Sequence, residues 1–338
     1  MEGLYHIHFR NQEGCEMKEN KAILVSICCT TYNHEKYIKQ ALDSFLEQNV
    51  QFNYEICIHD DASTDSTPQI LLEYQNKYPQ KINLILQKEN QTQKGIKKIS
   101  YVFNHTRARG KYIAFCEGDD YWTDCNKLQK QIEFMEKNND FSMTFHSSKI
   151  VNTSGEKTGK LQPFPCDKEV STDEIIYGGG GICPTASIIY RKECFNNPPQ
   201  FYFDSPVGDY PMQIILASKG KVFYFNKEMS AYRKVLSESA SWSFINNSKE
   251  KKLLVYKGLE LMLKEFNNYT NYQYMNAVLK AIRLNDIELN ILNRNFWGLL
   301  NKGVREEIKK MPFSKKIKLI TRISAPRFYE KLLKRKYK

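Results

Sequence analysis

The sequence predicts an α/β fold with a largely parallel sheet. In the first part of the chain, apolar runs of strand length alternate with segments whose apolar residues recur at helical spacing. Strands that alternate with helices of about 10 to 15 residues are typical of such a fold. The chain has 338 residues and 41% hydrophobic content, so it is long and apolar enough to bury a core.

The predicted elements follow one another in a regular order. They are a strand at 22–29 (AILVSICC), a helix in HEKYIKQALDSFLEQ, a strand at 54–59, a helix at 67–78, a strand at 82–87, a helix over about 96–109 and a strand at 111–117. From Lys249 onward the apolar spacing predicts a group of further helices, and Pro312 interrupts this pattern.

Polar clusters follow three of the predicted strands. They are Thr30 to Asn33, then Asp60 and Asp61, and finally Asp119 and Asp120. Ligands of parallel sheets bind beyond the carboxyl ends of the strands. We therefore expect the three clusters to face one crevice, although each of them alone could also be a solvated turn.

The first turn lacks the glycine-rich loops that bind dinucleotides or nucleoside triphosphates. It reads CTTYNHEK, which contains neither G-x-G-x-x-G nor G-x-x-x-x-G-K-[ST]. Adjacent Asp residues at a strand end instead suit a hard divalent cation, whose other positions are filled by phosphate oxygens and water. We expect Mn²⁺ or Mg²⁺, because a cation would offset carboxylates that are costly to bury unpaired.

The chain resembles the family 2 glycosyltransferases, bacterial enzymes of the GT-A fold. The resemblance rests on VSICCTTYNHEKYIKQALDSFLEQ, EICIHDDASTDST and RGKYIAFCEGDDYW. It is dense over residues 24–135, weaker to about residue 244 and absent beyond. It implies a Rossmann-like, mostly parallel sheet flanked by helices, and the transfer of a sugar from a nucleotide diphosphate donor with inversion.

The resemblance also implies a nucleotide site in the first two polar clusters. Thr30 and Tyr32 match residues that hold the nucleobase, Tyr32 by stacking, and Asn33 belongs to the same turn. Asp61 matches an Asp that reads the uracil edge, so a UDP-sugar is the expected donor. Family members often have Pro where this chain has Thr31, a difference that should affect the stiffness of the loop more than its chemistry.

The third cluster and two basic positions complete the implied donor site. Asp119 and Asp120 match the family's D-x-D motif, with Asp120 as the metal ligand and Asp119 as a contact to the ribose or around the metal. Lys98, next to Lys97, and also Arg233 lie where the family sometimes carries a basic residue that faces the diphosphate.

The family's reaction needs a base, which the resemblance places at the start of a helix about ninety residues after the metal motif. Asp209 in SPVGDYPMQIILASKG matches that position, and Asp204 is the second candidate. An Asp two residues before Pro211 is also a good start for a helix, so a purely structural role is the alternative.

These observations predict a metal-dependent inverting glycosyltransferase that moves one sugar to a hydroxyl of a glycan or polyprenyl-linked oligosaccharide, in capsule, O-antigen or exopolysaccharide assembly. One alternative is a sugar nucleotidyltransferase or another metal-dependent phosphotransfer enzyme. Such enzymes need a basic, glycine-rich loop near the first strand, which this chain lacks. The other is an inactive module that binds sugar nucleotides. The sequence does not identify the sugar or the linkage.

Positive charge is concentrated in the last third of the chain. Residues 245–338 contain 22 Lys and Arg against 8 Asp and Glu, whereas residues 1–244 contain 28 against 30. No nucleic-acid signature accompanies this charge, so no nucleic-acid partner is expected. Residues 313–338 mix ten basic residues with apolar ones, a composition suited to an anionic membrane surface.

The expected organisation is a lead-in at 1–20, a GT-A catalytic domain at 21–244 and a basic helical region at 245–338. The catalytic domain would comprise a nucleotide-sugar half to about residue 135 and an acceptor half at 136–244. No apolar run in the sequence reaches the length of a membrane span, and the N-terminus lacks the pattern of a secretion signal. We expect a cytoplasmic protein that lies peripherally on the inner face of the plasma membrane.

Overall fold

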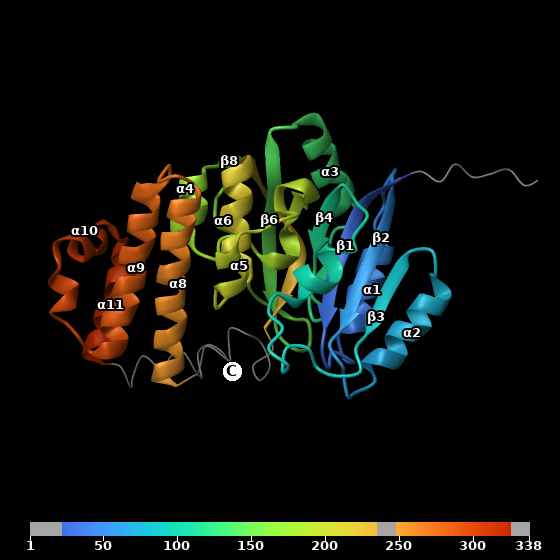
Figure 1. Cartoon of the computed structure of the whole chain (residues 1–338), viewed down its shortest axis with the longest axis horizontal. Helices are drawn as coiled ribbons and strands as arrows, with labels where there is room; N and C mark the ends of the chain where they lie inside the picture. Colours follow the sequence, from blue (N-terminus) through green and yellow to red (C-terminus); the bar gives the residue numbers. More distant parts are fainter. Residues whose placement is uncertain (1–21, 235–247, 326–338) are drawn as a thin grey trace, which may run out of the picture.

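The computed structural model describes residues 22–234 and 248–325. Its centre is a ten-stranded sheet with the order β3-β2-β1-β4-β9-β6-β10-β5, in which β7 pairs with β6 and β8 with β10. The strands are β1 (Ile23–Thr31), β2 (Asn53–Asp60), β3 (Ile82–Leu86), β4 (Tyr112–Phe115), β5 (Tyr121–Trp122), β6 (Phe141–Val151), β7 (Lys157–Leu161), β8 (Lys168–Val170), β9 (Ile189–Arg191) and β10 (Lys221–Arg233). The predicted α/β fold is confirmed (Figure 1). The predicted lead-in at 1–20 lies outside the described residues.

The sheet is parallel in its first half and mixed in its second. β1 runs parallel to both β2 and β4, and β2 runs parallel to β3. Beyond β4 the short strand β9 is antiparallel to both neighbours, while β6 and β10 are parallel to each other. The parallel half therefore contains the four strands that the sequence predicted, and their carboxyl ends share one edge.

Alternate side chains of the buried strands pack into two separate cores, one on each face of the sheet. In β1, Ile27 and Cys29 pack on one face of the sheet and Cys28 packs on the other. The first core is completed by α1 (Ile38–Leu46), α2 (Thr67–Lys77) and α3 (Lys127–Lys137), and the second by α4 (Thr172–Gly178), α5 (Gln200–Asp204) and α6 (Asp209–Lys219). Because both faces are covered, the strands are largely apolar, although they also bury bonded polar side chains such as Ser26, which donates to Glu55 over 2.7 Å.

The segment before β4 differs from the prediction. Instead of a helix over about 96–109, it forms a short π-helix at Ser100–His105. Lys98 has a φ of 58°, which a right-handed helix does not allow, so the helix cannot begin earlier. This backbone turns the Lys98 side chain toward a distant loop, described below.

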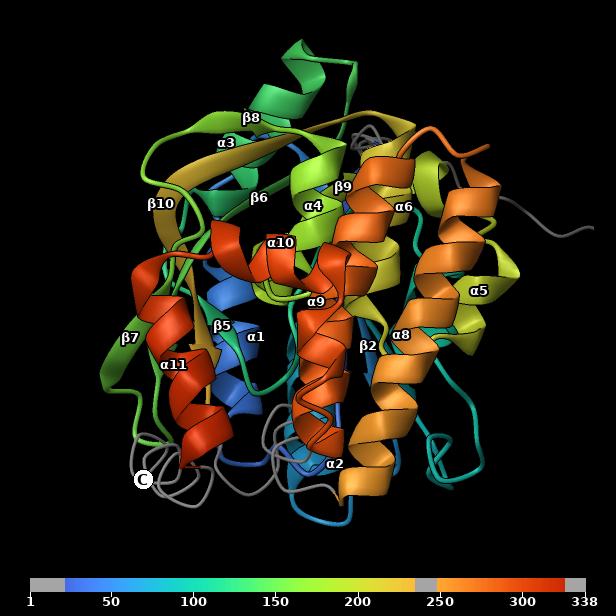
Figure 2. The same cartoon turned by 90° about the vertical axis from the view of Figure 1, so that its left-hand side faces the viewer.

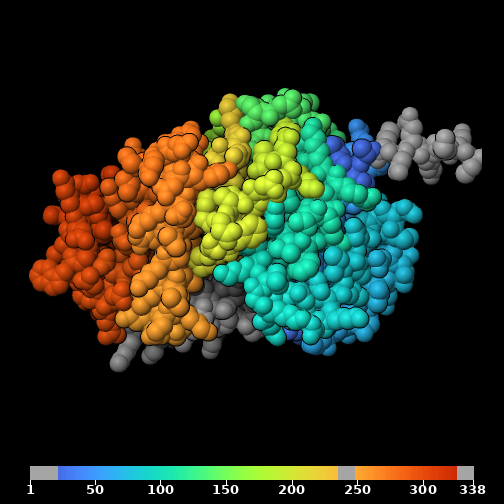
Figure 3. Space-filling model, viewed as in Figure 1, coloured from blue at the N-terminus to red at the C-terminus, as the bar shows by residue number. Residues whose placement is uncertain are grey.

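Within residues 248–325, four helices and a short 3₁₀ turn, η4 (Gly298–Leu300), follow the sheet. They are α8 (Lys249–Tyr269), α9 (Met275–Asn293), α10 (Lys302–Lys310) and α11 (Phe313–Ser324). α8 and α9 bury Leu263, Phe266 and Val278 in the same core as α6, whereas α10 and α11 form a small core of their own with the end of α9. Figure 2 shows α9 beside α4 and α8 beside α5, and Figure 3 shows the red residues of α10 and α11 on the outer side of α8 and α9. The boundary at residue 244 remains a prediction, because part of the helical region shares a core with the sheet.

None of the helices within residues 22–234 and 248–325 is both long and apolar enough to cross a membrane.

Candidate active site

The carboxyl ends of β1, β2 and β4 bring the three polar clusters together. The N–H of Gly118 donates to the carbonyl of Thr30 over 2.9 Å, and the N–H of Asp61 donates to the carbonyl of Thr31 over 3.0 Å. A Cβ atom on Gly118 would lie 2.8 Å from Oγ1 of Thr31, so the close approach of β4 to β1 requires glycine there. The predicted convergence of the three clusters is thus present in the fold.

The turn after β1 is bonded to the turn after β2. Asn33 has a left-handed backbone with φ of 55°, and its N–H donates to Oγ of Ser63 over 2.8 Å. The Oδ1 atom of Asn33 accepts from the N–H of Thr64, also over 2.8 Å. The neighbouring Tyr32 side chain is 39% exposed. The bonded turns therefore fix the backbone around an aromatic ring that is open to a stacking partner.

Asp61 is buried and bonded to the loop after β3. Its carboxylate accepts from the N–H of Gln91 over 2.7 Å, from the N–H of Thr92 over 3.1 Å and from Oγ1 of Thr92 over 2.7 Å. This carboxylate therefore holds the loop in place. The predicted contact of Asp61 with a uracil edge remains a prediction.

Three carboxylates follow β4 in the segment CEGDD. Asp120 is buried, and its Oδ1 accepts from the N–H of Arg233 over 2.7 Å, while burial and the charge of Asp119 raise its pKa well above the ordinary value. Although Glu117 is exposed, surrounding protein partly shields it from water. This shielding and the charges of Asp119 and Asp209 raise the pKa of Glu117 to about 7. The cluster therefore concentrates negative charge that favours a proton or a cation.

The chemistry of this cluster fits a hard divalent cation. Its metal-binding atoms would be carboxylate oxygens, and their pKa values are raised first by burial and then by neighbouring negative charges, which a cation would offset. Within the ranges 22–234 and 248–325, no three His, Cys, Asp or Glu side chains are grouped so as to hold a metal by themselves. A cation bound at Asp120 would therefore need oxygen ligands from a bound diphosphate and water.

Arg233 lies beneath the acidic cluster rather than in the open. Its side chain is buried and donates to the carbonyls of Asp119, Asn152 and Thr153 and to Oε1 of Gln40. The guanidinium also lies 4.6 Å from the centre of the Tyr37 ring and 5.3 Å from that of Tyr121. This placement favours support of the acidic segment over the predicted contact with the donor diphosphate.

Lys98 joins two loops that are more than one hundred residues apart in sequence. Its Nζ donates to the carbonyl of Ser205 over 2.9 Å and to that of Val207 over 2.5 Å. Burial and the charge of Lys97 lower the pKa of Lys98 to about 8. The ammonium group therefore bonds to the loop that precedes α6, so a contact with the diphosphate would have to be shared with these carbonyls.

Asp209 is the first residue of α6, and its carboxylate lies among loops from three parts of the chain. Burial raises its pKa, whereas a hydrogen bond from the N–H of Tyr210 and the charge of Lys98 lower it in part. A Cβ atom on Gly180 would lie 3.3 Å from both carboxylate oxygens. The glycine-rich loop at 177–181 is therefore a neighbour of Asp209, which sequence spacing did not reveal.

The second candidate base lies in a different environment. Asp204 is exposed at the end of α5 and accepts a hydrogen bond from Gln200 over 3.1 Å. Asp209, in contrast, lies close enough to Glu117 for its charge to raise the pKa of that residue. The fold thus brings Asp209 to the acidic cluster. Glu117 stands in the CEGDD segment but was not among the predicted site residues.

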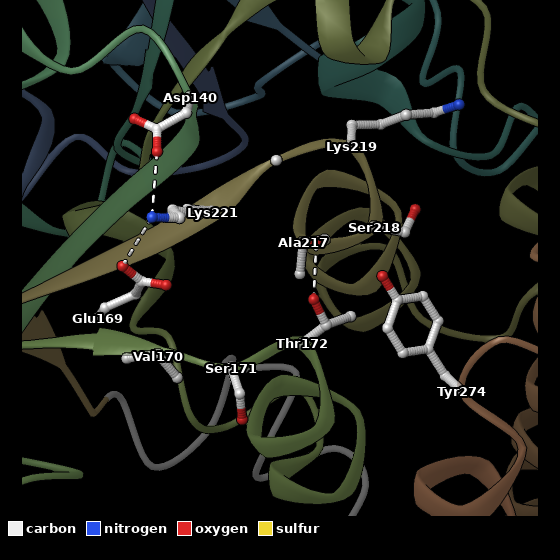
Figure 4. A pocket seen from close by; sticks show the side chains of 11 residues that line it. Asp140, Glu169, Val170, Ser171, Thr172, Ala217, Ser218, Lys219, Lys221 and Tyr274 are labelled. Carbon is white, nitrogen blue, oxygen red and sulfur yellow. Dashed lines mark hydrogen bonds and ion pairs between the residues drawn. The ribbon is translucent and has the colours of Figure 1, made fainter.

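Two surface hollows are lined by residues other than the aspartates of the candidate site. One, of about 380 Å³, lies at the end of α6, where Lys221 bridges Asp140 and Glu169 (Figure 4). Lys221 begins β10, whereas the acidic cluster is bonded to Arg233 at the other end of this strand. The other hollow, of about 810 Å³, lies between α1 and the segment 121–125. Neither is lined by Asp119, Asp120 or Asp209.

Comparison with known sequences places the first half of the chain in one family. The sequence model of the family described as Glycosyl transferase family 2 matches residues 26–197. The uncharacterized protein Rv1520 of Mycobacterium tuberculosis is 34% identical over 214 residues, which cover 62% of this chain and 58% of that protein. The Escherichia coli UDP-Glc:alpha-D-GlcNAc-diphosphoundecaprenol beta-1,3-glucosyltransferase WfgD is 29% identical over 180 residues, 53% of this chain and 64% of that one. The chain spans less than two thirds of the length of these relatives.

Solved structures share the fold at low sequence identity. TarS 1-349 of S. aureus in complex with UDP has a TM-score of 0.59 at 18% identity and covers 90% of this chain and 82% of its own. The mannosyltransferase PcManGT of Pyrobaculum calidifontis, in complex with GDP-Man and Mn2+, has a TM-score of 0.52 at 13% identity and covers 97% and 88%. Together with the family match over residues 26–197, they show that the chain has the GT-A fold and belongs to glycosyl transferase family 2.

Proposed function

We propose that this protein is a metal-dependent inverting glycosyltransferase that moves one sugar from a UDP-sugar to a hydroxyl of a glycan or lipid-linked oligosaccharide. The observation that carries the proposal is the approach of Asp209 to the acidic cluster at the carboxyl ends of β1, β2 and β4. It puts a carboxylate that can accept a proton, at the start of α6, within electrostatic range of carboxylates suited to hold a donor diphosphate through a cation.

The donor would lie across the bonded turns after β1 and β2. In this proposal Tyr32 stacks on the base, Thr30 and Asn33 shape the turn, and Asp61 holds the neighbouring loop while it faces the base edge. UDP is favoured because WfgD is named for UDP-Glc and a related TarS structure contains UDP-GlcNAc. PcManGT was solved with GDP-Man, so the base is the part of the donor that needs a direct test.

The acidic cluster would hold the diphosphate end of the donor. Asp120 is the proposed direct ligand of Mn²⁺ or Mg²⁺, Asp119 the contact to the ribose, and Arg233 the support of both through its bonds to their backbone and side chain. The bound cation would supply Lewis-acid stabilisation of the leaving diphosphate. Lys98 would reach the diphosphate only by giving up one of its bonds to the loop at 205–207.

Asp209 would act as the base. Its carboxylate would accept the proton of the acceptor hydroxyl as that oxygen attacks the anomeric carbon and the bond to the diphosphate breaks. Burial raises the pKa of Asp209, which makes it a better proton acceptor than an exposed Asp, and the charge of Lys98 keeps the carboxylate form accessible. The loop at 177–181 would bound the space where the acceptor hydroxyl arrives.

The proposed acceptor follows from the acceptor for which one relative is named. WfgD is named for a sugar on diphosphoundecaprenol. We infer an acceptor of the same class, a glycan on a lipid carrier in polysaccharide assembly, and hence a cytoplasmic protein at the inner face of the plasma membrane. Residues 313–338 are the proposed membrane contact, and only 313–325 of them lie in the described part of the chain.

A donor panel tests the proposal. Purified protein is incubated with Mn²⁺ and each of several UDP- and GDP-sugars, and release of the nucleoside diphosphate is measured with and without EDTA. Metal-dependent release from one UDP-sugar is expected. Binding of GDP-mannose without any binding of UDP would overturn the choice of donor. Binding without turnover in the presence of lipid-linked acceptors would favour an inactive module. Formation of a nucleoside triphosphate and a sugar 1-phosphate when pyrophosphate is added to the nucleotide-sugar would favour a nucleotidyltransferase.

A further inference from the structure

Helix α11 has two apolar faces, and only one of them is buried. Leu319 packs in the small core with Ile287 and Val304, and Ile323 lies against the same core. Phe313, Ile317 and Ile320 lie on a different face, with exposed fractions of 78%, 48% and 62%. In the sequence these residues look like one set of apolar side chains among basic ones, but the fold divides them between two faces of the helix.

The exposed residues form one continuous stripe along the helix. Phe313, Ile317 and Ile320 are spaced by four and then three residues, the spacing that lines up side chains on one helical face. A helix docked through Leu319 has no packing need for a second apolar stripe. Such a stripe on a folded protein indicates an interaction surface.

The charges around the stripe are positive. α11 contains no Asp or Glu, and Lys315 and Lys318 are exposed. Arg322, on the docked side, is bonded to Glu288, so that cation is already neutralised. The last turn of α10 adds Lys309, while Lys310 of the same turn is paired with Glu307 over 3.8 Å. An apolar stripe flanked by lysines is complementary to a surface with an apolar interior and anionic head groups.

A second copy of the chain is a poorer match for this surface. A two-fold interface would place the same face of two α11 helices against each other and would bring their lysines together without acidic partners. Protein interfaces are also depleted in Lys at their centres. The segment 326–338, which follows in sequence, carries six further basic residues and one Glu, so its charge is also mainly positive.

We propose that α11 binds an anionic membrane by inserting Phe313, Ile317 and Ile320 among the lipid head groups, while Leu319 keeps the helix docked on the protein. α11 lies at the end of the molecule opposite α2 and β3 (Figure 1), where no other described element covers the stripe. The inference deepens the membrane contact of the proposed function by naming the residues that make it. It is tested without a sugar donor, so its failure would leave the transferase proposal standing.

The test is co-sedimentation of the full chain with vesicles of phosphatidylcholine, with and without phosphatidylglycerol. We expect binding to the anionic vesicles that weakens with added salt. The triple variant Phe313→Ser, Ile317→Ser, Ile320→Ser should lose at least about tenfold in partition coefficient, since each apolar group contributes to insertion. Lys315→Gln with Lys318→Gln should lose binding to anionic vesicles in particular.

A matched control removes exposed apolar surface elsewhere. Leu254 and Leu261 on α8 are 69% and 58% exposed. Their double replacement by Ser should leave vesicle binding unchanged. Circular dichroism checks that each variant is folded. Hydrogen exchange of residues 313–324 in the wild type is a second measurement that needs no variant, and anionic vesicles should slow this exchange.

Two results would overturn the proposal. One is binding of the triple variant at the wild-type level, together with unchanged hydrogen exchange in α11. The other is a wild-type dimer on size-exclusion chromatography that the triple variant converts to a monomer while vesicle binding stays the same, because the stripe would then serve a second copy of the chain.

Discussion

The Nζ atom of Lys98 lies 2.9 Å from the carbonyl oxygen of Ser205, and this bond ties the segment before β4 to the loop that starts α6. The same Nζ atom also donates a hydrogen bond to the carbonyl of Val207, so Lys98 holds this loop at two points. Asp209 follows two residues later. Lys98 is thus placed to fix the position of the proposed base rather than to contact the donor alone.

Replacement of Lys98 by Met should therefore act on turnover more than on donor binding. Loss of two hydrogen bonds from a charged group, worth about 1.5–3 kcal/mol each, should loosen the loop and lower kcat by at least about tenfold. The loss of positive charge near Asp209 should also raise the pKa of that residue, so the acidic limb of the kcat profile should move to higher pH.

Lys97→Met is the matched control, because Lys97 is the exposed neighbour of Lys98. Calorimetry gives the donor Kd of each variant, and kcat is measured across pH. A large loss of donor affinity with unchanged kcat in Lys98→Met would instead support the diphosphate contact that the sequence predicted.

Replacement of Asp120 and replacement of Asp209 should impair different steps of the reaction. Asp120→Ala should abolish metal-dependent donor binding, because it removes the proposed ligand of the cation. Asp209→Asn should leave donor binding intact and remove transfer, because an amide cannot accept the proton. Near wild-type turnover in Asp209→Asn would show that the base is another group, with Glu117 as the next residue to test.

The acidic cluster should contribute a loss of stability to the metal-free protein as pH rises. Glu117, Asp120 and Asp209 have pKa values raised in the folded protein, so these groups bind more protons there than in the unfolded chain. Their contribution to stability is lost as pH rises from about 4.5, an ordinary Glu value, through about 7, the folded pKa of Glu117. Burial lowers the pKa values of three histidines, His59, His105 and His146, which act in the opposite sense over the same pH range. The effect of the cluster therefore has to be measured against a variant that keeps these histidines.

Thermal unfolding in EDTA at pH 5 and pH 7 measures this effect. Between pH 5 and pH 7 the midpoint of the wild type should fall relative to that of Asp120→Asn by a few degrees, at roughly 2 °C per kcal/mol for a chain of this size, because the histidines are common to both proteins. Mn²⁺ should raise the wild-type midpoint more at pH 7 than at pH 5, since protons compete for the same oxygens. Asp120→Asn should reduce this effect of Mn²⁺; equal midpoints of wild type and variant at each pH would count against the charge argument.

The sequence predicted the parts of the fold that depend on local patterns. The parallel strands and the polar clusters at their ends follow from apolar runs and from residue types, which sequence displays directly. The positive φ of Lys98 and the resulting short π-helix were not predicted, because they depend on a partner in the loop at 205–207. Such a contact between residues 107 positions apart leaves no periodic signal.

The placement of the candidate site residues could be predicted to a similar degree, whereas their roles remain predictions. Asp119, Asp120 and Asp209 were chosen from motif positions, and the fold brings them to one region. The burial of Arg233 beneath the acidic segment was not predicted, because a buried and an exposed Arg look alike in sequence. The closeness of Gly180 to Asp209 was not predicted either, since a run of glycines more often indicates a flexible loop than a close neighbour of a carboxylate.

The helical region should influence the base loop through one close contact. A Cβ atom on Gly258 of α8 would lie 3.0 Å from two ring carbons of Pro206, in the loop that Lys98 also holds. Replacement of Gly within a helix usually stabilises it, by about 1 kcal/mol for Ala. In Gly258→Val we expect no such gain, because the larger side chain must displace Pro206 and with it the approach to Asp209. We expect kcat to fall about fivefold to tenfold while donor Kd stays unchanged.

Leu261→Val, an exposed change on the same helix, controls for the β-branched side chain. Wild-type kcat together with a raised unfolding midpoint in Gly258→Val would show that α8 does not constrain the loop.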